Sequence, residues 1–204
     1  RSYPYKSGLK NYVFKQKDEY YIVSTNKGTI TSVYATGKGV KVSPLKIGES
    51  SSHIFEDTSI NPEPTVKTKG KTYKFEMSDE DLKTQTLIKY GDVYAQIYSD
   101  QQTNKILAVR FLDANTLATL QPYKLNRAED EGQISESSDD KIPHEQNPNQ
   151  LITLYEVTNK MREMKNLKSL KVNNDIARIA AINLYEATDK GSNSVEFTEN
   201  ALTQ

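Results

Sequence analysis

The sequence predicts an α+β protein: a duplicated antiparallel β-hairpin module with short helices, followed by a linker and a helical segment. Residues 1–127 contain short runs of β-branched and aromatic residues, separated by turns rich in Gly and Asn. An acidic stretch with few apolar residues follows at 128–148. From 149 to 204, apolar residues recur at helical spacing. We therefore divide the chain into a β-rich domain (1–127), a linker (128–148) and a helical part (149–204).

The first unit of the β-rich domain is a hairpin. Residues 20–25 (YYIVST) and 29–35 (TITSVYA) are strand-like, and Asn26-Lys27-Gly28 between them is typical of a tight turn. We expect residues 12–14 to pair with this hairpin as a further strand.

A second unit repeats the same plan. Residues 71–76 (KTYKFE) alternate as a strand does, and residues 93–98 and 106–112 flank a longer polar turn at 99–105. A strand followed by a hairpin thus occurs twice, which predicts an internal duplication.

Two short helices are expected between these strands, at 49–57 and 78–83. Ser78 is a good N-cap, and Asp79, Glu80 and Asp81 follow where the helix dipole favours negative charge. The same acids could suggest calcium, but a calcium loop alternates its ligands along the chain. We interpret them as a helix start.

The linker is predicted from its composition. Residues 128–141 are acidic and small, and Pro143 and Pro148 follow. Such a stretch buries too little apolar surface to offset its ordering entropy. We expect limited proteolysis to cut within 128–148.

The helical part contains two apolar stripes at helical spacing, and a third helix could begin near residue 195. The first helix has Asn149 as its cap, with Pro148 just outside; Asn174 or Asp175 can cap the second. The stripes consist of Leu151, Leu154, Tyr155, Thr158 and Met161, and of Ile176, Ile179, Ala180, Asn183, Leu184 and Ala187.

Composition excludes several functions. Lys plus Arg and Asp plus Glu both total 27, so the formal net charge is zero and no basic footprint for nucleic acid exists. The chain has no Cys, which excludes disulfides and thiolate metal sites. No apolar run reaches the roughly 18 residues of a membrane span. Because the chain begins with Arg1 rather than Met, we expect a removed upstream segment, so the missing signal peptide does not argue for the cytoplasm.

No catalytic, cofactor or metal site emerges from the motifs. The two histidines, His53 and His144, lie in different segments without metal-ligand spacing, and we interpret both as surface residues. Gly37-Lys38-Gly39 lacks the remaining positions of a phosphate-binding loop and is interpreted as a turn. We expect no cofactor.

Tyrosines are the candidate binding residues. The chain has 13 Tyr and no Trp. Exposed tyrosines on a sheet suit glycan or protein recognition, whereas buried ones would replace Phe and Trp in a small core, the interpretation we favour. The candidate surface consists of Tyr20, Tyr34, Tyr94 and Tyr98.

Several ordered segments resemble the CAP-associated domain of Gram-positive secreted proteins. Residues 42–48 (VSPLKIG) look like its VSPxKIG segment, and residues 121–125 (QPYKL) like its closing PYxL. Residues 91–100 and 108–112 look like its second hairpin. The resemblance covers roughly residues 3–125 and implies an extracytoplasmic location, secreted or associated with the cell envelope.

The helical part resembles the start of a CAP (SCP-like) domain, the family of cysteine-rich secretory proteins. That resemblance implies an incomplete α-β-α sandwich at 149–204. The matching positions are Asn159, Arg162, Leu167, Leu170, Asn173 or Asn174, Ile176 and Ala180.

The resemblance departs at the CAP site, which pairs two His with two Glu. The first His position holds Glu196 or Phe197, and no His follows it. Residues 198–200 (TEN) only partly match the family's Gly-Glu-Asn. We therefore expect no enzymatic activity in this chain.

Three functions remain open. The β-rich domain could dock on its own CAP domain or on another envelope protein. It could bind cell-wall glycan or peptidoglycan through a tyrosine face. A hydrolase activity could reside in a complete CAP domain. We favour a non-enzymatic binding or regulatory module.

Overall fold

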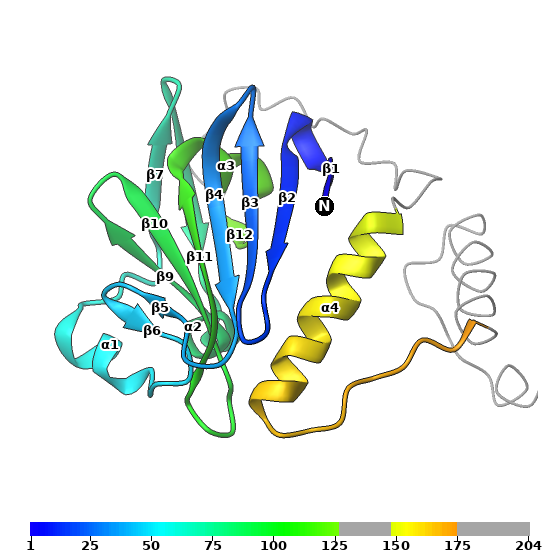
Figure 1. Ribbon diagram of the computed structural model, residues 1–204. Coiled ribbons are helices and arrows are strands. Elements are labelled where there is room, and N and C mark those ends of the chain that lie inside the picture. Colours follow the sequence, from blue (N-terminus) through cyan, green and yellow to red (C-terminus); the bar gives the residue numbers. More distant parts are fainter. Residues whose placement is uncertain (127–147, 175–204) are drawn as a thin grey trace, which may run out of the picture. The chain divides into compact units, whose positions relative to one another are not determined.

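The computed structural model of the chain describes residues 1–126 and 148–174. Its main feature is a seven-stranded antiparallel sheet (Figure 1). The expected linker, apart from Pro148, and the later expected helices lie outside the described residues. In sheet order the strands are β1 (Ser2–Pro4), β2 (Lys10–Lys15), β3 (Tyr20–Asn26), β4 (Thr29–Thr36), β11 (Ile106–Asp113), β10 (Val93–Ser99) and β9 (Gln85–Tyr90).

Two three-stranded meanders form most of this sheet. Strands β2, β3 and β4 form one, β9, β10 and β11 form the other, and β4 pairs antiparallel with β11. The first predicted hairpin is confirmed: Lys27 and Gly28 form its turn with positive φ values of 48° and 84°. The second is confirmed with a turn that closes at Asp100 and Lys105.

The strand predicted at residues 71–76 is confirmed, but it does not pair with the second hairpin. These residues form β8 (Lys71–Glu76), which pairs with β7 (Thr65–Thr68) and β12 (Lys124–Leu125) in a separate sheet. The second hairpin pairs with β9 instead. The missed signal was Gly91-Asp92, a two-residue turn between β-rich runs.

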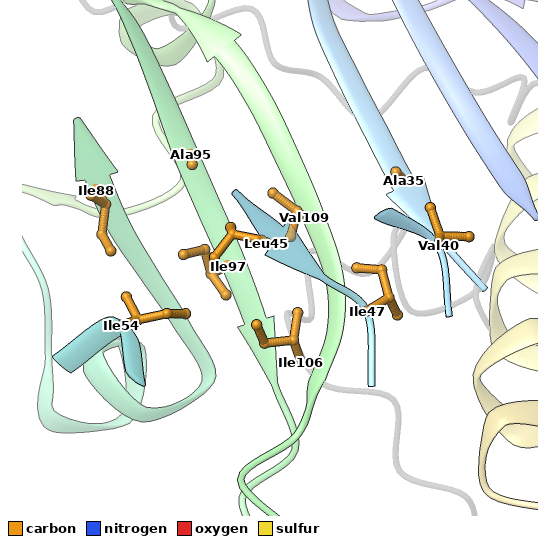
Figure 2. Packing of buried hydrophobic residues seen from close by; sticks show 10 residues of the cluster. All are labelled: Ala35, Val40, Leu45, Ile47, Ile54, Ile88, Ala95, Ile97, Ile106 and Val109. Carbon is orange, nitrogen blue, oxygen red and sulfur yellow. The ribbon is translucent and has the colours of Figure 1, made fainter. Parts of the chain in front are cut away.

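The half of the sheet around β10 is covered on both faces. Strands β5 (Lys41–Val42) and β6 (Leu45–Lys46) and helix α1 (Ser52–Asp57) lie over one face. Figure 2 shows Ile97, Val109 and Leu45 of this cluster pointing toward one another. A second cluster, with Phe75, Leu112 and Leu117, covers the opposite face. Four consecutive residues of β10 are buried, so its sequence lacks the alternation of a half-exposed strand.

The short helices begin at polar caps. Helix α2 (Asp79–Thr84) has the predicted cap at Ser78, whose hydroxyl accepts from the Asp81 amide in a capping box. Helix α1 is shorter than expected, and α3 (Ala114–Leu120), capped by Asp113, was not foreseen.

The helix expected after the linker is α4 (Pro148–Met164), which begins at Pro148 rather than after it. Proline suits the first helical position because that N–H has no partner within the helix. Helix α4 and the sheet belong to one compact unit, Arg1–Lys168; the second unit, Ser169–Gln204, is described only over 169–174. Within the described ranges, no helix is long and apolar enough to cross a membrane.

Candidate interaction site

Helix α4 contacts the first meander through side chains spaced three or four residues apart. Thr153, Glu156, Val157, Lys160 and Met164 follow the helical repeat and lie on one face. Thr153 is buried, and Val157 packs against the apolar cluster of Tyr3, Val13 and Tyr20. We call these five α4 residues the docking face.

Glu156 is the centre of the docking face, and it receives three donors from the first strands of the chain. Its Oε2 accepts from the Tyr20 hydroxyl at 2.7 Å and pairs with the Arg1 guanidinium. Its Oε1 accepts from Lys15 Nζ at 2.7 Å. Arg1 also donates to Thr153 Oγ1 at 2.9 Å. A single carboxylate on α4 thus joins β2, β3 and the residue before β1.

The titration of this cluster follows from its contacts. Burial alone would raise the pKa of Glu156, but the hydrogen bonds from Lys15 and Tyr20 and the charge of Arg1 hold it below its ordinary value. Burial and the bond to Glu156 raise the pKa of Tyr20. At neutral pH the carboxylate is therefore charged and the phenol keeps its proton to donate.

The last turn of α4 makes further polar contacts. Lys160 Nζ donates to the carbonyl of Lys17 at 2.8 Å. The Thr36 hydroxyl approaches Met164 Sδ at 3.6 Å. Just beyond the helix, Lys165 pairs with Asp100 in the β10–β11 turn, and that pairing holds the pKa of Asp100 below its ordinary value.

The apolar stripe predicted for this helix is not its docking face. Leu151 is 52% exposed and Leu154 is 65% exposed. The sheet is instead contacted by residues of mixed polarity, because the partners on β2 and β3 are themselves charged or phenolic. Sequence periodicity located the helix correctly and its buried face incorrectly.

Three of the four candidate tyrosines lie in the core. Tyr20, Tyr34 and Tyr94 are 1%, 6% and 6% exposed, so they do not form an open binding face. Tyr34 and Tyr98 pack edge to face at 6.1 Å between ring centroids, and Arg110 lies over Tyr34. Tyr98, partly buried, donates to Gln96 Oε1 at 2.7 Å. These rings fill space that Phe or Trp would fill elsewhere.

Metal-ligating residues do not converge in the described parts of the chain, where no group of three His, Cys, Asp or Glu could hold an ion. His53 lies on α1, with its side chain 75% exposed and 3.4 Å from Glu56. His144 lies outside the described residues.

The docking face was not foreseen from sequence. Lys15 and Glu156 are far apart in the chain, and neither lies in a recognised motif. The available signal was weak: Thr153, Glu156 and Lys160 form a polar stripe beside the apolar one.

The fold and this site define an antiparallel α+β module that contacts a following helix through a polar face. The sequence profile of the family described as CAP-associated N-terminal matches residues 1–123. The chain belongs to that family.

Solved structures of Gram-positive proteins are similar to the chain. A cysteine-rich secretory protein (SAV1118) of Staphylococcus aureus is 60% identical with a TM-score of 0.85; the match covers 100% of this chain and 66% of that one. An extracellular protein containing an SCP domain from Bacillus anthracis is 27% identical with a TM-score of 0.79, covering 95% and 63%. The chain spans about two thirds of the length of these proteins. Although the first is described as a cysteine-rich secretory protein, this chain contains no Cys.

A curated relative is the uncharacterized membrane protein YlbC of Bacillus subtilis. It is 34% identical over 115 residues, which are 56% of this chain and 33% of the relative. The chain therefore spans about a third of that protein.

Proposed function

We propose that the chain is a non-enzymatic, extracytoplasmic interaction module of an envelope protein with a CAP domain. Its β-rich part holds α4, the helix that resembles the opening of the CAP domain, and so acts on its own CAP segment. The support for the CAP assignment is the Asn159 and Arg162 pattern and the secretory and SCP-domain descriptions of the similar structures.

The observation that carries this proposal is the Glu156 cluster. Three side chains of the β-rich part converge on one carboxylate of α4. Most of the stability of a helix in a protein comes from its tertiary contacts, so contacts of this kind hold the 17 residues of α4 in place.

The polarity of this contact favours a regulatory role over a purely structural one. Charged pairs across an interface determine the relative position of the partners and the choice of partner more than they increase affinity. A helix held mainly by hydrogen bonds and ion pairs can be released by a change of charge. We therefore propose that docking of α4 is reversible.

The proposed lack of enzymatic activity and the proposed location rest on the sequence and the relatives. The family resemblance implies a site of two His and two Glu, but the first His position holds Glu196 or Phe197, and His53 and His144 both lie before it in the sequence. Relatives described as secreted or extracellular support an extracytoplasmic location, and a relative labelled as a membrane protein is compatible with the envelope.

Zero-length cross-linking of the full chain with a carbodiimide tests the docking. The reagent joins an ammonium and a carboxylate in direct contact, as Lys15 and Glu156 are at 2.7 Å. We expect a Lys15–Glu156 cross-link by mass spectrometry. Lys160 and Glu163, 2.8 Å apart within α4, serve as the internal control for reactivity.

Two variants sharpen this experiment. Lys15→Arg keeps the charge but cannot form the cross-link, so the product should disappear while the Lys160–Glu163 product remains. If wild-type chain gives the Lys160–Glu163 product and no Lys15–Glu156 product, α4 is not docked as described and the proposal fails.

A further inference from the structure

A cavity of about 720 Å³ lies where the end of α4 meets three turns of the β-rich part. It is lined by residues of the Gly39 turn, the Gly48 turn, the β10–β11 turn and the segment from Met164 to Leu167. Its volume falls in the range of small-molecule sites, roughly 300–1,000 Å³.

The cavity combines apolar and cationic lining. Leu107 and Met164, both partly exposed, and Leu167, 49% exposed, supply apolar surface. A Cβ added at Gly39 or Gly48 would meet no atom within 4 Å, so open space lies beside both turns.

The charges around this cavity do not balance. Its lining holds four lysines and two acids. Lys46 pairs with Glu49 at 3.6 Å, and Lys165 pairs with Asp100. The lining lysines that remain, Lys38 and Lys105, take part in none of the ion pairs found among residues 1–126 and 148–174.

Acidic residues near the cavity do not neutralise the positive charge of Lys38 and Lys105. Lys38 also lines a smaller adjoining cavity of about 340 Å³ with Asp18 and Glu163. Glu163 pairs with Lys160 at 2.8 Å, and Asp18 lies in the adjoining cavity rather than among the lining residues of the larger one. Among the described residues, the larger cavity therefore carries two lysines without a paired acid beside its apolar lining.

We propose that this cavity binds a small phosphate monoester with an apolar body. A phosphate monoester is close to a dianion at neutral pH, which matches the charges of Lys38 and Lys105, and lysine binds phosphate as a point charge. The apolar body would cover Leu107, Met164 and Leu167. The Gly37-Lys38-Gly39 turn does not have the sequence of a phosphate-binding loop. It would contribute the ammonium group of Lys38 and not the backbone cradle of such a loop.

This inference rests on the proposed function, because the segment from Met164 to Leu167 lines the cavity only while α4 is docked. The end of α4 is well defined: Leu167 N–H donates to the Arg162 carbonyl at 2.9 Å and Asn166 N–H to Glu163 at 3.0 Å. Asn166 has φ 55°, so the helix closes with a left-handed cap that fixes this wall of the cavity.

Amide NMR of the full chain at constant ionic strength tests the proposal, with phenyl phosphate as the probe. We expect saturable shifts at the Gly39 and Gly48 amides and none at Gly28 in the distant β3–β4 turn. Inorganic phosphate, which lacks the apolar body, and phenol, which lacks the charge, should each bind more weakly than phenyl phosphate.

Variants separate this site from diffuse charge attraction. The double variant Lys38→Ala/Lys105→Ala should raise the Kd for phenyl phosphate on the order of tenfold or more. Lys67→Ala/Lys71→Ala, which removes two exposed lysines from the β7–β8 hairpin, should leave the Kd unchanged.

Equal weakening by both double variants, or no saturable shift in wild type, would overturn the proposal. If that occurs while the Lys15–Glu156 cross-link forms, the ligand inference fails and the docking function stands. If the cross-link is absent as well, both fail together.

Discussion

Glu156 illustrates how one carboxylate can place a helix. Its side chain is 16% exposed and accepts from a phenol, an ammonium and a guanidinium. Hydrogen bonds to charged groups each contribute roughly 1.5–3 kcal/mol, but exposed pairs contribute less than about 1 kcal/mol. Because Lys15 is 64% exposed, we assign most of the stabilisation to Tyr20 and Arg1.

The pH dependence of docking should follow Glu156. Its pKa in the folded state lies below the ordinary value of 4.5, so its contribution is present above that pH and is lost as the pH falls through the lower folded value. Asp100, held low by Lys165, acts in the same direction below 3.8. We expect the Val157 methyl signals to shift toward exposed values as the pH drops below 4.5.

Glu156→Gln is the matched variant for this titration. Glutamine keeps the size of the side chain and can accept a hydrogen bond, but it does not titrate in this range. The acid transition of Val157 should therefore shrink in Glu156→Gln. An unchanged transition in this variant would assign the pH dependence to another group.

At the scale of single elements, local chemistry explains the short helices better than the strands. The capping box of α2 is complete: Asp81 N–H donates to Ser78 Oγ at 3.1 Å, and Ser78 N–H donates to Asp81 Oδ2 at 2.9 Å. This capping box can be predicted from four consecutive residues, Ser78 to Asp81. The sequence of strand β9, in contrast, can also be interpreted as a continuation of the polar segment that precedes it, so it does not predict a strand by itself.

Ser78→Ala should destabilise the chain by about 1 kcal/mol, because the substitution leaves the Asp81 amide without its acceptor. The free energy of unfolding from urea denaturation, followed by circular dichroism, measures the loss. Ser59→Ala, at an exposed position outside any helix, should change it by less than about 0.5 kcal/mol. Equal effects of the two substitutions would mean that the cap does not stabilise α2.

At the scale of the whole molecule, the sequence was most informative where structure is local. The hairpin at Lys27-Gly28, the cap at Ser78 and the existence of α4 were all predicted, since turn and cap residues act over a few positions. The family was also predicted and is confirmed by the match over residues 1–123. An internal duplication stays a prediction, although the sheet does contain two meanders.

Long-range contacts explain what was missed. The core interpretation of the tyrosines was favoured, but their partners, Glu156 for Tyr20 and Arg110 for Tyr34, come from other parts of the chain, which no window of sequence contains. The docking face of α4 is a further example, because its apolar stripe predicted the wrong side. An amphipathic pattern shows that a helix has an apolar face, but not which face its neighbour in the fold will contact.

Amide hydrogen exchange of α4 in the full chain tests the central claim most directly. We expect peptides from 148–164 to be protected in wild type and to exchange about 30-fold faster in Glu156→Ala, since a loss of about 2 kcal/mol corresponds to that factor. Alanine is the best helix former, so helix propensity cannot cause the change. Glu163→Ala and Leu154→Ala, which alter exposed positions of the same helix, should leave protection intact. Unprotected α4 in wild type, or equal loss in Leu154→Ala and Glu156→Ala, would contradict docking through the polar face.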